Sequence, residues 1–129
     1  MIVIDSSVWI DYFNGMITPQ TDKLDILFST DIILVGDLIL AEVLQGFRHD
    51  SDYLTAKNLL ELLEFREMVG KEIAIRSAGY YRTLRQQGIT VRKTIDMLIG
   101  SFCIANQLPL LYADRDFDYL IPLGLISVI

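Results

Sequence analysis

Short apolar runs alternate with longer amphipathic segments along this chain, and that alternation is what most constrains its fold. Runs such as IVI and DIILV are typical of buried strands, whereas the segments between them have apolar residues at helical spacing. Strands that alternate with helices favour a parallel sheet covered on both faces. We therefore expect one α/β domain over residues 1–129, with a central parallel sheet of about four to five strands flanked by helices.

The expected boundaries follow from capping and chain-breaking residues. Ser6 and Ser7 offer an N-cap for the first helix, and Gly88 is the expected end of the fifth. The predicted helices span 6–14, 18–28, 36–47, 50–65, 71–87 and 94–107, with a helical turn at 117–120. The predicted strands span 2–4, 31–35 and 110–112, with a very short strand at 68–69 and a closing strand at 125–128.

The amino-acid composition indicates how much apolar surface the domain has and in which cellular compartment it functions. Apolar residues make up 52% of the chain, which indicates a sheet buried on both faces or a sizeable apolar surface for a partner. The single cysteine, Cys103, excludes an internal disulfide and is consistent with a reducing cytoplasm. Polar residues interrupt the longest uncharged run and no secretory signal is visible, so we expect a cytoplasmic protein that does not cross a membrane.

Three acidic residues stand alone in apolar surroundings. Asp5 is the only charge among the first ten residues, Glu42 the only one in LILAEVL, and Asp96 the only one in TIDMLIGSFCIANQL. Surface helices usually carry several charges along one face, and an unpaired carboxylate in an apolar place either costs free energy or becomes neutral. These acids therefore need a specific partner. Gly100, one turn after Asp96, is expected to leave space beside that acid.

A further pair of acids, Asp114 and Asp116, follows the predicted strand LLY, as Asp5 follows the first strand. Residues just beyond parallel strands meet at one edge of the sheet, where such folds bind ligands. Carboxylates gathered there repel one another by about 4 kcal/mol per pair at about 4 Å and an effective dielectric of about 20, so they need a cation. Oxygen ligands without His or Cys suit Mg²⁺ or Mn²⁺ rather than zinc. Singly, each acid could be a turn residue, a cap or an ion-pair partner; together they favour a metal pocket.

Four stretches of the sequence carry a resemblance to a known family. They are VIDSSVWIDYF, LILAEVLQGF, TIDMLIGSFCIA and LLYADRDFDYL, and they occur in the family's order along the whole length. On these stretches the chain resembles a PIN-domain ribonuclease, and more closely the VapC toxin of type II toxin–antitoxin pairs. Tyr112 and Ala113 depart from the pattern, because many relatives carry a small polar residue there.

The resemblance implies a PIN domain that acts as a metal-dependent endoribonuclease through an acidic pocket at one edge of the sheet. Asp5, Glu42 and Asp96 fall on the family's first three acids. The fourth falls on Asp114 or Asp116, with Asp114 favoured and Asp116 close by. The implied cofactor is Mg²⁺, with Mn²⁺ as a substitute. It is held mainly by Asp5 and Asp96, and Glu42 and Asp114 either complete that site or hold a second ion. It would activate a water for attack on an RNA phosphodiester, with Glu42 as the water-orienting group or general base. A VapB-like antitoxin and a homodimer are the implied protein partners.

The charge distribution adds candidates for RNA contacts. A net charge of −6 argues against binding of nucleic acid through the overall field. Residues 71–93, however, contain six basic residues and one acid, a net charge of +5, so the rest of the chain carries −11. Arg82, Arg85, Arg92 and Lys93 are the candidates, of which the last two come just before Asp96. The alternative is an ordinary solvated helix face.

Three other functions match parts of the pattern. A catalytically inactive PIN-like RNA-binding or scaffold domain is usually recognisable by lost acids, whereas all four positions are filled here. A haloacid-dehalogenase-like phosphohydrolase needs a second Asp two residues after the first, where this chain has Ser7. A receiver-like signalling domain expects adjacent acids after the first strand, where this chain has serines. An active ribonuclease is therefore favoured.

Overall fold

The expected parallel sheet is present and has four strands. The computed structural model describes residues 1–129, and its strands lie in the order β3-β2-β1-β4. They are β1 (Ile2–Ile4), β2 (Ile33–Gly36), β3 (Glu64–Arg66) and β4 (Leu110–Leu111), and all pair in parallel. Every residue of β1, β2 and β4 is buried, as expected for strands covered on both faces. Because the strands are parallel, their carboxyl ends meet at one edge of the sheet.

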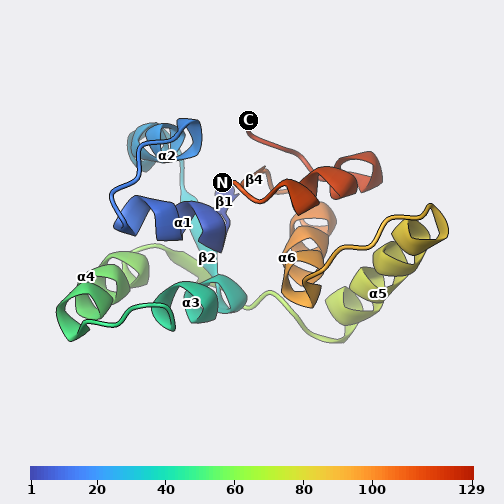
Figure 1. The fold of residues 1–129 in the computed structure, drawn as a ribbon, viewed down its shortest axis with the longest axis horizontal. Helices are drawn as coiled ribbons and strands as arrows, with labels where there is room; N and C mark the ends of the chain where they lie inside the picture. The colour runs from blue at the N-terminus through green and yellow to red at the C-terminus, as the bar shows by residue number, and fades with distance from the viewer.

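Seven helices flank this sheet. They are α1 (Ser6–Phe13), α2 (Pro19–Thr30), α3 (Asp37–Leu44), α4 (Asp50–Glu61), α5 (Lys71–Gln86), α6 (Thr94–Ala105) and the 3-10 helix η1 (Arg115–Leu123). In Figure 1, α1 to α4 lie on one side of the strands, and α5, α6 and the C-terminal segment lie on the other. Helices α1 and α3 begin directly after β1 and β2, which sets their first residues at the carboxyl edge of the sheet. None of the helices is both long enough and apolar enough to span a lipid bilayer.

The third strand differs from the prediction. Helix α4 ends at Glu61 instead of Phe65, and Phe65 lies in β3, opposite Val35 of β2. All three residues of β3 are exposed, so this edge strand has no apolar pattern by which the sequence could reveal it. Met68, predicted to form a strand with Val69, is instead a fully buried core residue.

The C-terminal segment also differs from the prediction. Residues 125–128 form only an isolated parallel bridge, in which Ser127 pairs with Leu110 of β4. Leu110 donates its N–H to the carbonyl of Ile126 at 2.9 Å, and its own carbonyl accepts from Val128 at 3.2 Å. These two hydrogen bonds cover the outer edge of β4, so β3 is left as the open edge of the sheet.

Gly100 serves packing rather than the space beside Asp96, contrary to the prediction. A Cβ at Gly100 would overlap Leu120 Cδ1, because η1 packs against α6 at this point. We expect Gly100→Ala to lower the free energy of unfolding by about 1–3 kcal/mol through overpacking. Gly79→Ala is the matched control, since a Cβ at this exposed position of α5 meets nothing within 4 Å. It should raise the same free energy by about 0.5–1 kcal/mol. Urea unfolding of both variants measures the difference, and effects of the same sign would contradict it.

Candidate metal centre

Asp5 stands where β1 ends and α1 begins. It is itself the N-cap of α1, which corrects the prediction that Ser6 and Ser7 cap this helix. Its Oδ2 accepts hydrogen bonds from the Ser7 N–H at 3.0 Å and the Ser7 hydroxyl at 2.6 Å. The residue is 2% exposed, and its Oδ1 is buried without a hydrogen-bond partner. The cap therefore uses one carboxylate oxygen and leaves the other unsatisfied.

Glu42 and Asp96 reach the same place from two other helices. Glu42 lies on α3, half-buried, and its Oε1 accepts a hydrogen bond from the Ser6 hydroxyl at 2.9 Å. Asp96 lies in the first turn of α6, where the helix dipole favours a negative charge. It is 4% exposed, and its Oδ2 is buried without a partner. Two buried carboxylate oxygens thus remain unpaired in one neighbourhood.

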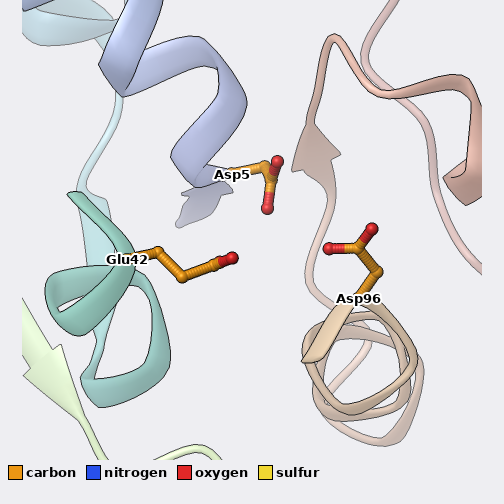
Figure 2. A group of neighbouring side chains, drawn as sticks. All are labelled: Asp5, Glu42 and Asp96. Carbon is orange, nitrogen blue, oxygen red and sulfur yellow. The ribbon is translucent and has the colours of Figure 1, made fainter. Parts of the chain in front are cut away.

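The three carboxylates converge on one point. Each offers an oxygen, and these oxygens lie within 4.8 Å of one another. Figure 2 shows the three side chains pointing toward a common centre from the start of α1, from α3 and from α6. They open into a cavity of about 380 Å³, which is lined by Asp5, Ser6, Ser7, Ile10, Asp11, Glu42, Lys93, Asp96, Ala113 and Asp114. We refer to this space as the acidic cavity.

The acidic cavity holds more negative than positive charge, since Lys93 is its one basic lining residue. Burial, followed by the charges of Asp5 and Asp114, raises the pKa of Asp96 to about 7. Burial also raises the pKa of Asp5; hydrogen bonds from Ser7 oppose that shift, and the charge of Glu42 adds to it. A divalent cation would reduce the repulsion and satisfy the two unpaired oxygens. The donors are all oxygens, which suits a hard cation. Asp5, Glu42 and Asp96, which we call the acidic triad, could therefore bind a metal ion.

The two candidates for the fourth acid lie in different places. Asp114 lines the acidic cavity, and its Oδ2 lies 3.6 Å from Lys93 Nζ. Its Oδ1 accepts from the N–H of Asp116, because Asp114 is the N-cap of η1. Asp116 lies in the first turn of η1 and is not among the residues that line the cavity.

Of the four basic candidates, only Lys93 lies at the acidic cavity. Arg82 lines a separate groove of about 400 Å³ between α5 and α6. The guanidinium of Arg85 lies 5.7 Å from the centre of the Tyr81 ring, a distance that suits a cation–π contact. Arg92 is exposed and forms no ion pair.

Ser7 is a further site residue, which the sequence indicates only as a candidate helix cap. Its hydroxyl donates to Asp5 Oδ2 and also accepts from the N–H of Ala113 at 3.1 Å. It thereby ties the turn after β1 to the turn after β4, which carries Asp114. The side chain of Ala113 departs from the family's pattern, but the hydrogen bond to Ser7 uses the backbone N–H of Ala113 and does not depend on that side chain. The only signal in the sequence was a second hydroxyl residue two positions after Asp5.

Comparison with known proteins agrees with this geometry. The family model described as "PIN domain" matches residues 2–120. The chain is 32% identical over 121 residues to Ribonuclease VapC11 of Mycobacterium tuberculosis and to VapC ribonuclease Mb1587 of Mycobacterium bovis. Each match covers 92% of this chain and 90% of the relative. The chain belongs to the VapC ribonucleases of the PIN domain family. The family predicted from the four sequence stretches is therefore confirmed.

Solved structures of the same fold place this VapC-type PIN domain in the expected architecture. The VapBC2 complex of Rickettsia felis, bound to a promoter DNA fragment, contains a chain that matches with a TM-score of 0.79 at 20% identity. DNA-bound VapBC of Salmonella typhimurium gives 0.75 at 15% identity. The first match covers 99% of this chain and 98% of the other, as does the second. At these identities the likeness demonstrates the fold, which confirms the predicted α/β class.

Proposed function

We propose that this protein is a metal-dependent endoribonuclease, the toxin of a VapBC-type toxin–antitoxin module, acting on RNA in the cytoplasm. The observation that carries the proposal is the convergence of Asp5, Glu42 and Asp96, with two buried carboxylate oxygens unpaired. It is supported by 32% identity to named VapC ribonucleases over most of the chain. A structural role would leave these like charges uncompensated, at a cost to stability.

Each carboxylate has a part in the proposed reaction. Asp5 and Asp96 would hold Mg²⁺, with Glu42 and Asp114 beside it and Mn²⁺ as a substitute. When bound, the ion polarises the phosphodiester and lowers the pKa of a water. Ser7 holds Asp5 in one orientation, and Ser6 does the same for Glu42. Glu42 would then orient the attacking water and accept its proton as general base. The water oxygen would bond to phosphorus as the bond to the 3′ oxygen breaks. That oxygen leaves as an alkoxide and takes a proton from solvent to become the 3′-hydroxyl.

Cleavage of RNA by the purified protein tests the proposal. Total cellular RNA is incubated with the protein in Mg²⁺, in Mn²⁺ and in EDTA. We expect cleavage with either metal, 3′-hydroxyl ends on the products, and none with EDTA. Cleavage that persists in EDTA would contradict the metal-dependent mechanism. Binding of RNA without cleavage in any metal would favour the alternative, a catalytically inactive RNA-binding or scaffold PIN domain.

Protein partners belong to the same proposal. The structural relatives are described as VapBC complexes, which supports a VapB-like antitoxin as partner here. Exposed apolar side chains such as Ile17 (87%) and Leu62 (86%) offer surface for an antitoxin or for a homodimer. Co-expression with the product of the adjacent reading frame, followed by size-exclusion chromatography, tests whether the two proteins form a complex.

Three of the basic candidates belong to the same proposal as RNA contacts. Arg82, Arg85 and Arg92 are proposed to contact RNA phosphates outside the acidic cavity.

The fourth acid can be assigned by a matched pair of variants. We expect Asp114→Asn to lower kcat/KM for RNA cleavage by about 10- to 100-fold, as for other groups that support a metal site. Asp116→Asn makes the same chemical change two residues away, outside the acidic cavity, and should have the smaller effect. Cleavage assays of both variants at one Mg²⁺ concentration give the comparison. A larger loss for Asp116→Asn would reverse the assignment.

A further inference from the structure

Lys93 occupies a special position in the acidic cavity. It is the N-cap residue of α6 and the only basic residue among those that line the cavity. Its Nζ lies 3.6 Å from Asp114 Oδ2, and its side chain is 61% exposed. The ammonium is therefore held by electrostatic attraction on the side of the cavity where Asp114 lies.

The four acids that fall on the family's motif positions form two groups in the cavity. Asp5, Glu42 and Asp96 present oxygens close enough together to share one ion. Asp114, which would complete a second ion site, is instead paired with Lys93. Nucleases that use two metal ions hold them about 3.5–4 Å apart between shared carboxylates. In this protein an ammonium lies beside the carboxylate that such a second ion would need.

The charges in the cavity agree with this division. The acids Asp5, Glu42, Asp96 and Asp114 carry four negative charges when ionised, and Asp11, which also lines the cavity, carries a fifth. One divalent ion leaves three of these five charges uncompensated. The Lys93 ammonium offsets one more, so its removal raises the residual negative charge by one and favours a second divalent ion.

We infer that Lys93 takes the place of a second metal ion: the cavity binds one divalent ion, and the Lys93 ammonium supplies the other positive charge beside the scissile phosphate. This inference rests on the proposed ribonuclease function. Lysine is well suited to the task, because its ammonium is a compact point charge on a flexible stem and binds phosphate oxygens strongly. As the water oxygen bonds to phosphorus and the 3′ oxygen departs, Lys93 keeps its proton and neutralises charge on the phosphate oxygens.

The stoichiometry of metal binding tests the inference directly. Isothermal titration of Mn²⁺ into the metal-free protein should give one ion per chain for the wild type and two for Lys93→Gln. Lys93→Arg keeps the positive charge and should stay at one. Arg92→Gln is the matched control, since it removes the same charge from the neighbouring residue, which pairs with no carboxylate. It should also bind one ion.

The rate of RNA cleavage by Lys93→Gln is a second test of the inference. With Mg²⁺ sufficient to fill one site, we expect Lys93→Gln to lower kcat/KM by about 10- to 100-fold, the effect of losing one charge-assisted hydrogen bond. The dependence of its rate on Mg²⁺ should steepen toward second order, whereas that of the wild type stays first order.

The outcomes separate this inference from the proposed function. Two ions bound by the wild type, or one ion bound by Lys93→Gln, would overturn the inference and leave the ribonuclease proposal intact. Absence of metal binding by the wild type would overturn both. Circular dichroism of Lys93→Gln confirms that the variant is folded, which the exposure of the side chain leads us to expect.

Discussion

Asp96→Asn is expected to lower kcat/KM for RNA cleavage by about 10³-fold at saturating Mg²⁺. Asp96 is buried in the first turn of α6 and has one carboxylate oxygen without a partner. Its side chain points toward the centre of the acidic triad. An amide offers at most one neutral oxygen there, so it weakens metal binding and the stabilisation of the charge that develops on the phosphate. Metal-assisted stabilisation is worth several kcal/mol, and each 1.36 kcal/mol is a factor of about ten in rate. Single-turnover cleavage of a defined RNA measures the loss.

Asp52→Asn is the matched control for that experiment. Asp52 also lies in the first turn of a helix, α4, but it is exposed and is not among the residues that line the acidic cavity. It loses the same charge and the same interaction with a helix dipole, so its cleavage rate should stay within about twofold of the wild type, as for ordinary surface changes. Full activity of Asp96→Asn would remove Asp96 from the metal centre and contradict the proposed mechanism.

The metal-free protein is expected to lose stability as the pH rises from about 4 to 7. The pKa of Asp96 is raised from an ordinary value of 3.8 to about 7 in the folded state. Between these values the folded protein keeps a proton that the unfolded chain releases, so the free energy of unfolding falls as the pH rises. The fall should reach roughly 2–4 kcal/mol when the pH has passed 7. The raised pKa of Asp5 acts in the same direction. Urea unfolding in EDTA at several pH values measures the slope.

Two further measurements test whether the acidic cavity causes this change in the free energy of unfolding with pH. Asp96→Asn is neutral at every pH, so it should flatten the profile and be more stable than the wild type above pH 7, although it is nearly inactive. Mg²⁺ at about 100 times its dissociation constant should restore about 2.7 kcal/mol to the wild type at pH 8. A wild-type stability that rises with pH under these conditions would contradict the electrostatic account of the site.

Much of the fold was predictable because its signals are local. Strands β1, β2 and β4 are fully buried, so they appear in the sequence as apolar runs. Helix α6 carries one acid in an otherwise apolar and largely buried segment, which made Asp96 conspicuous. Strand β3 was missed because its side chains are all exposed, and only its backbone pairing with β2 defines it. Gly100 was misread because Leu120, the residue that requires its missing side chain, lies on another element.

The sequence by itself determined which residues could make a metal site: lone acids in apolar segments at strand ends and helix starts. Burial makes an unpaired charge costly, so those residues stood out without any structure. Only the tertiary structure decided how they are arranged. It brought Asp5, Glu42 and Asp96 to within reach of one ion, paired Asp114 with Lys93, and let Ser7 join two turns that are far apart in the chain. Those relations depend on distances between elements, and the parallel order of the strands sets these distances.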